Sequence, residues 1–258
     1  MGVAALLLGS CALPCAPAVV AAAADQATVL AGIRARVQTS DFRATGRLVQ
    51  VGANGERTTY KLTIKGHWFP DGLRLLCEIT EPASARTWLL LHMSATGHLT
   101  MEEEKPGSKI ASELPFERWS EPLLGTGFSY EDLAEAQFFW KGQELLAPAK
   151  FGARDCFVVK STPSADERSD YASVTSWVDR SIFYPVHVVK TLRSGGQQKD
   201  FLYYGLRQNN GVWSASQVEV KVQGKPGSSL LVIENGTERA KLTRKDFDMN
   251  QAALPKGE

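Results

Sequence analysis

The sequence predicts a mainly β protein built on one antiparallel sheet of about eleven strands, with helices only at the start, in the middle and at the end. Two observations support this. Apolar and polar residues alternate along most of the chain, and hairpin-type turns such as Asn54-Gly55 and Asn235-Gly236 separate the alternating stretches. A sheet of this size curls into a barrel or splits into two packed sheets. No internal repeat or interdomain linker occurs, so residues 25–258 are expected to form one domain.

Residues 1–24 carry no charged side chain and end in four alanines, which is typical of a secretory signal peptide cleaved after small residues. Two other interpretations stay open. A membrane anchor would need ~20 apolar residues in a row, and Pro14 and Pro17 interrupt this run. Leu8-Gly9-Ser10-Cys11 resembles a bacterial lipobox, in which Cys11 would carry the lipid anchor. The sequence therefore predicts an exported protein.

The net charge of +1 gives no electrostatic reason to expect a nucleic-acid partner. Beyond residue 24 the chain keeps two cysteines, Cys77 and Cys156. In an oxidising compartment they could form a disulfide, and separate buried thiols are the alternative that stays open. Without a CxxC pair they indicate neither a zinc site nor a redox motif.

The first element is an amphipathic helix in the range 25–40, where Val29, Leu30, Ile33 and Val37 have helical spacing. Strands follow it. We expect them at residues 42–51, 60–65, 73–79, 86–94, 98–101, 156–161, 171–179, 185–192, 199–206, 213–222 and 229–234. The run TWLLLHM inside 86–94 is apolar at consecutive positions, which indicates burial on both faces of its strand or an exposed apolar surface. A last short helix is expected around residues 244–250.

The middle of the chain has little strand pattern and contains GTGFSYEDLAEAQFFW at residues 125–140. Ser129 is a good N-cap, and Asp132 lies three residues later, close to a capping-box arrangement. Phe128 and Leu133 have the spacing of a hydrophobic staple. These features predict the start of a helix, with its acids placed where the helix dipole favours them.

The templates of catalytic sites are absent. Glu131 and Asp132 are adjacent and point apart on a helix, so they do not indicate a carboxylate pair for acid–base chemistry. The sequence has no HExxH and no GxSxG, and Gly125-Thr126-Gly127 lacks the third glycine of a dinucleotide site. The histidines have no metal-ligand spacing. We therefore expect a protein that is not an enzyme and needs no metal or cofactor.

Four stretches together resemble the outer-membrane lipoprotein-sorting, LolA-like family: residues 123–133, 171–190, 199–206 and 213–222. The most specific parts are FSYEDL and, after it, WVD-x-x-x-x-x-P. The resemblance implies that residues 25–258 form a half-open antiparallel β-barrel with an N-terminal helix and a central helical plug. It also implies a cavity that shelters acyl chains, since each methylene exposed to water costs ~0.8 kcal/mol.

The expected lining of this cavity comes from the apolar run and from the plug. The candidate lipid-binding residues are Trp88, Leu89, Leu90, Leu91, Met93, Trp119, Leu123, Leu124, Phe128, Leu133 and Trp140. Only one alternating set on each strand can face inward, and the pattern does not say which.

The resemblance implies a monomeric periplasmic carrier that takes the acyl chains of a lipoprotein or lipid to the outer membrane. Its expected partners are an inner-membrane transporter and an outer-membrane acceptor. Two other functions stay open: a lipid sensor of envelope stress, and an accessory subunit of a lipid-exporting membrane transporter.

Overall fold

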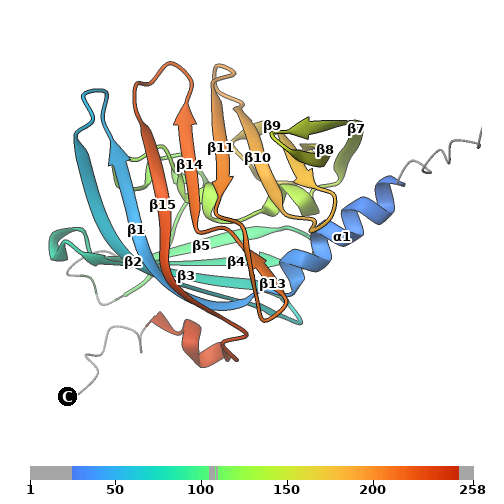
Figure 1. Cartoon of the computed structure of the whole chain (residues 1–258). Coiled ribbons are helices and arrows are strands. Elements are labelled where there is room, and N and C mark those ends of the chain that lie inside the picture. Colours follow the sequence, from blue (N-terminus) through green and yellow to red (C-terminus); the bar gives the residue numbers. More distant parts are fainter. Residues whose placement is uncertain (1–24, 105–107, 109, 250–258) are drawn as a thin grey trace, which may run out of the picture.

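Figure 1 shows the computed structural model, which describes residues 25–104, 108 and 110–249. The expected signal peptide at residues 1–24 and the lipidation candidate Cys11 lie outside the described residues. Within the described part of the chain, none of the helices has the length and apolar character needed to span a bilayer.

One large antiparallel sheet dominates the fold, as the sequence predicted (Figure 1). It contains thirteen strands within the described residues, where the sequence predicted about eleven, in the order β6-β5-β4-β3-β2-β1-β15-β14-β11-β10-β9-β8-β7. Their bounds are β1 Asp41–Val51, β2 Arg57–Phe69, β3 Gly72–Glu81, β4 Thr87–Ser94, β5 Leu99–Glu104, β6 Ser112–Glu113, β7 Gly142–Phe151, β8 Arg154–Thr162, β9 Tyr171–Asp179, β10 Pro185–Leu192, β11 Gln198–Tyr204, β14 Gln217–Val222 and β15 Ser228–Glu238. The end strands β6 and β7 do not pair with each other, so the sheet is curved but not closed.

Two further strands form a hairpin that is separate from the main sheet. β12 Arg207–Asn209 and β13 Val212–Ser214 pair only with each other, in the connection between β11 and β14. Asn210 and Gly211 form the turn and both have positive φ, which suits these residue types. We call this element the β12–β13 hairpin.

The sequence analysis missed β7, because this edge strand lacks the alternation that marks the others. Its residues are half-buried or exposed along the whole strand. Its pairing with β8 becomes irregular between Leu146 and Ala149, where Pro148 has no N–H to donate. An edge strand tolerates a proline at an irregular position. Such a proline also disfavours pairing of the exposed edge with a strand of another chain.

The predicted N-terminal helix is confirmed. α1 Gln26–Gln38 follows the N-cap residue Asp25 and buries the four residues that the spacing indicated, Val29, Leu30, Ile33 and Val37. The Gln26 side chain donates to the carbonyl of Gln143 (3.0 Å) and accepts from the N–H of Leu145 (3.2 Å). The first turn of α1 therefore satisfies backbone groups on the free edge of β7.

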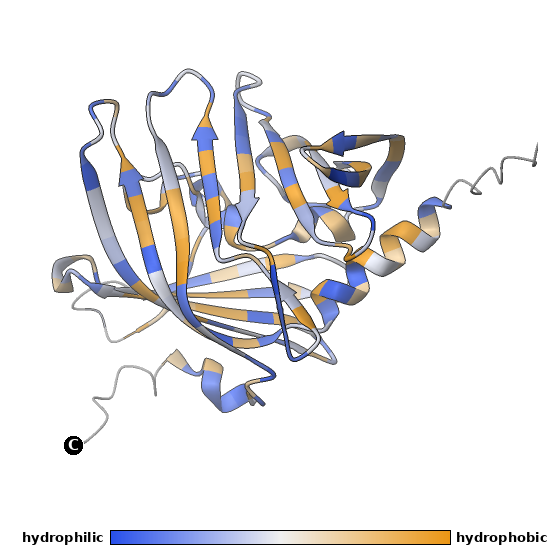
Figure 2. Ribbon diagram, in the orientation of Figure 1, coloured by the Kyte–Doolittle hydropathy of each residue, from blue (hydrophilic) through white to orange (hydrophobic). Residues whose placement is uncertain are grey.

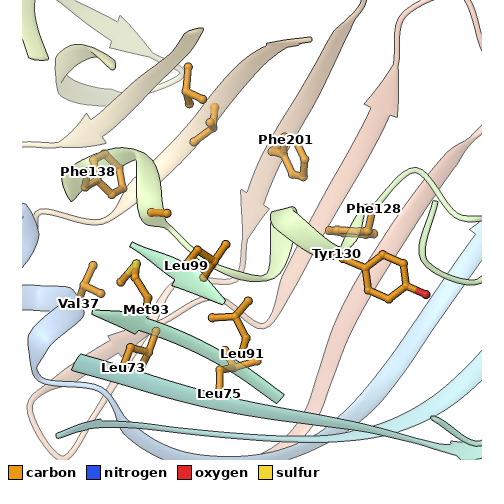
Figure 3. Packing of buried hydrophobic residues seen from close by; sticks show 14 of the residues in the cluster. Val37, Leu73, Leu75, Leu91, Met93, Leu99, Phe128, Tyr130, Phe138 and Phe201 are labelled. Carbon is orange, nitrogen blue, oxygen red and sulfur yellow. The ribbon is translucent and has the colours of Figure 1, made fainter. Parts of the chain in front are cut away.

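Most apolar side chains gather on the inner side of the curved sheet. Figure 3 shows part of this inner cluster, which includes Val37, Leu73, Leu75, Leu91, Met93, Leu99, Phe128, Tyr130, Phe138 and Phe201. Its members come from α1, from the strands and from the chain between β6 and β7. Figure 2 shows the alternation along the strands that places every second residue on this side.

The apolar run on β4 is buried on both faces, as one reading of the sequence expected. Leu89, Leu91 and Met93 belong to the inner cluster. Trp88 and Leu90 face the other way, into a smaller outer cluster that also contains Phe69, Leu76, Leu242, Phe247 and Met249. The last three residues belong to the C-terminal segment around the 3₁₀ turn η6 Arg244–Phe247, which covers the outer face of the sheet (Figure 1).

The middle of the chain is not an α-helical plug within the described residues. Residues 110–141, here the central segment, contain short 3₁₀ turns: η2 Phe116–Arg118, η3 Leu123–Gly125, η4 Tyr130–Leu133 and η5 Ala136–Phe139. The capping box of Ser129 and Asp132 forms as predicted, but the helix that it starts ends after one turn. An isolated helix this short gains little from its own hydrogen bonds, so tertiary contacts decide the conformation.

Phe247→Ala tests whether the C-terminal segment is held by the outer cluster. Phe247 is 3% exposed and packs edge-on against Phe69, with 5.6 Å between ring centroids. Removing the ring should cost about 3–5 kcal/mol locally and release the segment. Hydrogen exchange should then speed up in residues 240–249 and on the outer face of β3 and β4. Unchanged exchange there would contradict the outer cluster as described.

Candidate functional site

A cavity of roughly 270 Å³ lies on the inner side of the sheet. Its wall is formed by α1, by β1, β2, β3, β11, β14 and β15, by the β12–β13 hairpin and by the central segment around η4. Much of the lining is apolar or aromatic and includes Phe42, Leu73, Phe128, Phe201, Val218 and Leu231. Figure 3 shows Phe128 and Phe201 above Leu73 and Leu75 on opposite sides of this interior.

The structure brings two of the eleven predicted lining residues to this cavity, Phe128 and Leu133. Six others lie in the inner cluster but not in the cavity wall: Leu89, Leu91, Met93, Trp119, Leu123 and Trp140. Leu124 is half-buried against the same cluster. Trp88 and Leu90 are on the outer face, because consecutive residues of a strand point to opposite sides. The most apolar strand is therefore core and not cavity wall.

Sequence reasoning missed the strands that do line the cavity. They contribute pairs of residues two positions apart: Phe42 and Ala44 on β1, Phe201 and Tyr203 on β11, Leu231 and Ile233 on β15. The signal was present as alternation of apolar residues. A continuous apolar run such as that of β4 is a poorer indicator of a cavity wall, because a run buried on both faces is more typical of a packed core.

One end of the cavity is polar. This polar end contains Arg36, Glu135, Tyr184, Arg207, Ser214 and Glu238. The Arg36 guanidinium lies 2.5 Å from a Glu135 carboxylate oxygen and 4.7 Å above the ring centre of Tyr184. The Tyr184 hydroxyl in turn accepts from the N–H of Ala215, 3.2 Å away. The polar end thus joins the end of α1 to the β12–β13 hairpin.

A buried ionic cluster lies beside the cavity where the central segment meets β10 and β11. It consists of Ser129, Asp132, Tyr171, Lys190 and Lys199. The Asp132 carboxylate is fully buried, and Lys190 Nζ and Lys199 Nζ each lie 2.9 Å from one of its oxygens. It also accepts from the Tyr171 hydroxyl (2.6 Å), the Ser129 hydroxyl (2.9 Å) and the Ser129 N–H (2.8 Å).

These contacts decide the protonation of Asp132. Burial alone would raise the pKa of its carboxyl group, but the ammonium groups of Lys190 and Lys199 and the Tyr171 hydroxyl outweigh burial and hold the pKa well below its usual value. Asp132 is therefore ionised, and it bonds the central segment to two neighbouring strands of the sheet.

Glu131 behaves in the opposite way to its neighbour. It is 4% exposed, accepts hydrogen bonds from the Ser169 hydroxyl and the Asp170 N–H, and makes no ion pair with another described residue. Burial raises its pKa to about 7, while the two hydrogen bonds act to lower it. The two adjacent acids do not form a catalytic pair, because one is saturated by cations and the other is enclosed.

The ionic cluster contains a serine and a lysine in contact, a pair that can form a nucleophile and base in other proteins. Lys199 Nζ donates to Ser129 Oγ over 3.1 Å and to Asp132. A lysine that donates to the hydroxyl does not accept its proton, and Ser129 is 0% exposed. The described residues also contain no group of three or more metal-ligating side chains. The geometry of this cluster therefore holds the fold together and presents no nucleophile to the cavity.

Cys77 and Cys156, the possible disulfide partners, are separate buried thiols on β3 and β8. Seven strands of the sheet order lie between these two strands. Cys77 faces the inner cluster, and Cys156 is not part of it. Since a disulfide needs Cα atoms within about 7 Å, side chains placed this way do not meet.

A second hollow, of about 480 Å³, lies at the turns between β7 and β8 and between β9 and β10. It is lined by Ala153, Arg154, Asp155, Asp179, Arg180 and Ser181. Arg154 and Asp179 form an ion pair across it at 2.5 Å. Without large apolar side chains this hollow offers nothing to an acyl chain, so the cavity inside the sheet is the candidate site.

A family model described as "-like: Uncharacterized protein" matches residues 106–253, which is more than half of the chain. The chain belongs to that family. The matched range contains the central segment, the ionic cluster and the strands from β7 to β15 of this chain. No curated protein matches the sequence.

Three solved structures, two of them described as lipoprotein-sorting or LolA superfamily proteins, have the same fold as this chain. A putative outer membrane lipoprotein-sorting protein domain from Vibrio parahaemolyticus has a TM-score of 0.77 and 24% identity, covering 87% of this chain and 96% of that one. A LolA superfamily protein from Nitrosomonas europaea has a TM-score of 0.68 and 19% identity, covering 87% and 98%. A DUF1329 family protein from Desulfovibrio piger has a TM-score of 0.76 and 15% identity, covering 86% and 96%. The protein therefore has the LolA-like fold that its sequence resembles.

Asp132→Asn tests the ionic cluster in this family member. The change removes the one ionised carboxylate that two buried ammonium groups share, so the free energy of unfolding should fall by about 3–5 kcal/mol. Denaturant unfolding measures it. Asp166→Asn is the matched control, because Asp166 and its partner Lys141 are each 67% exposed and the change should have little effect. Equal losses of unfolding free energy in the two variants would contradict the stabilising role of the ionic cluster.

Glu131→Gln tests the raised pKa of Glu131. An unfolded chain releases this proton near the ordinary pKa of 4.5, and the folded protein near 7. Between these values only the unfolded state has lost the proton, so a rise in pH favours unfolding. The stability of the wild type relative to Glu131→Gln should fall from pH 4.5 to 7, by on the order of 3 kcal/mol, and level off above. A difference that is independent of pH would refute the assignment.

Proposed function

We propose that this protein is a carrier that shelters the acyl chain of a lipid or lipoprotein in the cavity inside its open sheet. The observation that carries this proposal is the apolar cavity itself, enclosed between the strands and the central segment. A protein interior is normally packed to the density of an organic crystal, with few voids larger than a water molecule. A space of roughly 270 Å³ with an apolar wall suits an apolar guest.

The energetics support transport of such a guest. Each methylene moved from water into an apolar wall gains ~0.8 kcal/mol, so an acyl chain crossing an aqueous compartment is strongly favoured to stay covered. The open edge strands β6 and β7 leave the curvature of the sheet free to adjust, which a closed barrel would not allow. The cavity is small, and a single chain fits its size better than several.

The route of transport follows from the same proposal. The apolar segment at residues 1–24 would direct export, and the carrier would act in the periplasm as a monomer. An inner-membrane transporter would load it and an outer-membrane acceptor would receive the guest. The similarity to the putative outer membrane lipoprotein-sorting domain from Vibrio parahaemolyticus supports this direction of transfer. No chemical step is required, and the carrier would need no cofactor.

Val218→Trp tests the proposal by filling the cavity. Val218 is half-buried on β14 and lines the cavity. Because the indole would occupy space that is empty in the free protein, we expect little loss of stability and a loss of acyl-chain binding of tenfold or more. Titration with a fluorescent fatty acid measures the binding, and native mass spectrometry of the protein from its own host would identify the passenger.

Val189→Trp is the matched control. Val189 is also a half-buried strand residue, on β10, but it does not line the cavity. Its substitution should leave acyl-chain binding unchanged. Wild-type protein that binds no acyl chain at micromolar concentration would end the carrier proposal.

A further inference from the structure

The polar end of the cavity contains one buried carboxylate that lacks a cationic partner. Glu238 is 8% exposed, lies at the end of β15 and lines the cavity. It accepts from the Ser214 hydroxyl (3.2 Å) and the Asn209 amide (3.4 Å), and it makes no ion pair with another described residue. Buried charges in proteins are normally paired. A carboxylate that accepts only two long hydrogen bonds from neutral donors can therefore still bind a cation.

The same end contains a guanidinium without a carboxylate partner. Arg207 begins the β12–β13 hairpin, is exposed and lines the cavity. Arg36 and Arg43, the other arginines in the wall, are ion-paired with Glu135 at 2.5 Å and with Asp246 at 3.1 Å. Within the described part of the chain, Arg207 makes no such pair, so its donors are available to an anion.

The two groups belong to one site. Arg207 is the cross-strand partner of Ser214 in the hairpin, and the Ser214 hydroxyl donates to Glu238. Arg207 lies on the same face of the hairpin as Ser214 and Asn209, the two residues that bond Glu238, but no ion pair joins Arg207 to Glu238. The apolar wall, with Phe128, Phe201 and Leu231, continues from this end into the interior.

We propose that the polar end binds the zwitterionic headgroup of a single-chain amphiphile, with an ammonium group at Glu238 and a phosphate or carboxylate at Arg207. The inference rests on the carrier function proposed above and names the class of its guest. A buried carboxylate selects for a cationic group, while the planar guanidinium matches the oxygens of a phosphate or carboxylate. The cavity volume of roughly 270 Å³ suits a guest with one chain better than one with several.

Binding of four single-chain amphiphiles, used below their critical micelle concentrations, separates the contributions of the ammonium group, the anionic group and the acyl chain. Palmitoyl lysophosphatidylethanolamine carries ammonium and phosphate, and Nε-palmitoyl-lysine carries ammonium and carboxylate. Palmitoyl lysophosphatidylglycerol carries phosphate alone, and monopalmitoylglycerol is uncharged. We expect the wild type to bind the zwitterions about tenfold more tightly than the uncharged lipid. The better of the two zwitterions identifies the anionic group.

Two variants assign the charges to residues. Glu238→Gln keeps an oxygen for Ser214 and Asn209. It should weaken the binding of both zwitterions about tenfold without weakening the binding of lysophosphatidylglycerol, which has no ammonium group. Arg207→Gln should weaken the binding of every ligand that carries a phosphate or carboxylate, including the two zwitterions, about threefold. The effect is smaller than that of Glu238→Gln because the Arg207 side chain is exposed. Arg57→Gln, an exposed arginine on β2 away from the cavity wall, is the control and should change nothing.

The outcomes separate this inference from the carrier function. If the four amphiphiles bind the wild type and both variants with equal affinity, the headgroup site is refuted and the carrier function stands. If none of the four binds the wild type, the carrier function fails and the headgroup site fails with it. Arg207→Gln is a surface substitution, so it gives a result even if Glu238→Gln does not fold.

Discussion

The pairing of Asp132 with Lys190 and Lys199 is the interaction on which the interior of this protein depends. The central segment has no α-helix within the described residues, so its own hydrogen bonds do not fix its position. Asp132 bonds it to β10 and β11 on one side of the sheet. Two residues earlier, the Tyr130 hydroxyl donates to Glu103 of β5, 3.0 Å away, on the other side. The turn η4 is thus bonded to strands on both sides of the open sheet and fixes the middle of the segment inside it.

Directional bonds explain why this anchor is ionic and not apolar. Replacing a buried ion pair by apolar side chains of similar volume is often neutral or stabilising, so what the ionic anchor adds is a set of bonds with fixed directions. The anchor also keeps the cavity apolar. Asp132 borders the cavity, yet five donors occupy its two oxygens, so it offers no free acceptor to a guest. Saturation by donors lowers the cost of placing the Asp132 charge beside an apolar space.

The features that the sequence predicted are those with local causes. Helical spacing located α1, hairpin turns and alternation located the sheet, and the two residues of the capping box, Ser129 and Asp132, are only three positions apart. The ionic cluster could not be found that way, because Lys190 and Lys199 are 58 and 67 residues from Asp132. The sequence also does not indicate which alternate residues of β4 face the inner side of the sheet. What covers Trp88 and Leu90 is a segment from the far end of the chain, and no pattern on β4 reports it.

The central segment and the β12–β13 hairpin both cover the cavity, but they are held in place by bonds of different strength. The central segment is fixed by buried ion pairs, and breaking such a pair costs about 3–5 kcal/mol. Among the described strands, the β12–β13 hairpin pairs only with itself. Its Asn209 and Ser214 side chains donate to Glu238 over 3.4 and 3.2 Å, and the N–H of Ala215, directly after β13, donates to the Tyr184 hydroxyl over 3.2 Å. Each of these bonds has a neutral donor and contributes about 1–3 kcal/mol, less than a buried ion pair. The hairpin is therefore the cover that moves at lower cost. Because Arg207 and Ser214 lie on it, a headgroup bound at Glu238 would hold the hairpin closed over the acyl chain, and loss of the headgroup contact would free the chain to leave.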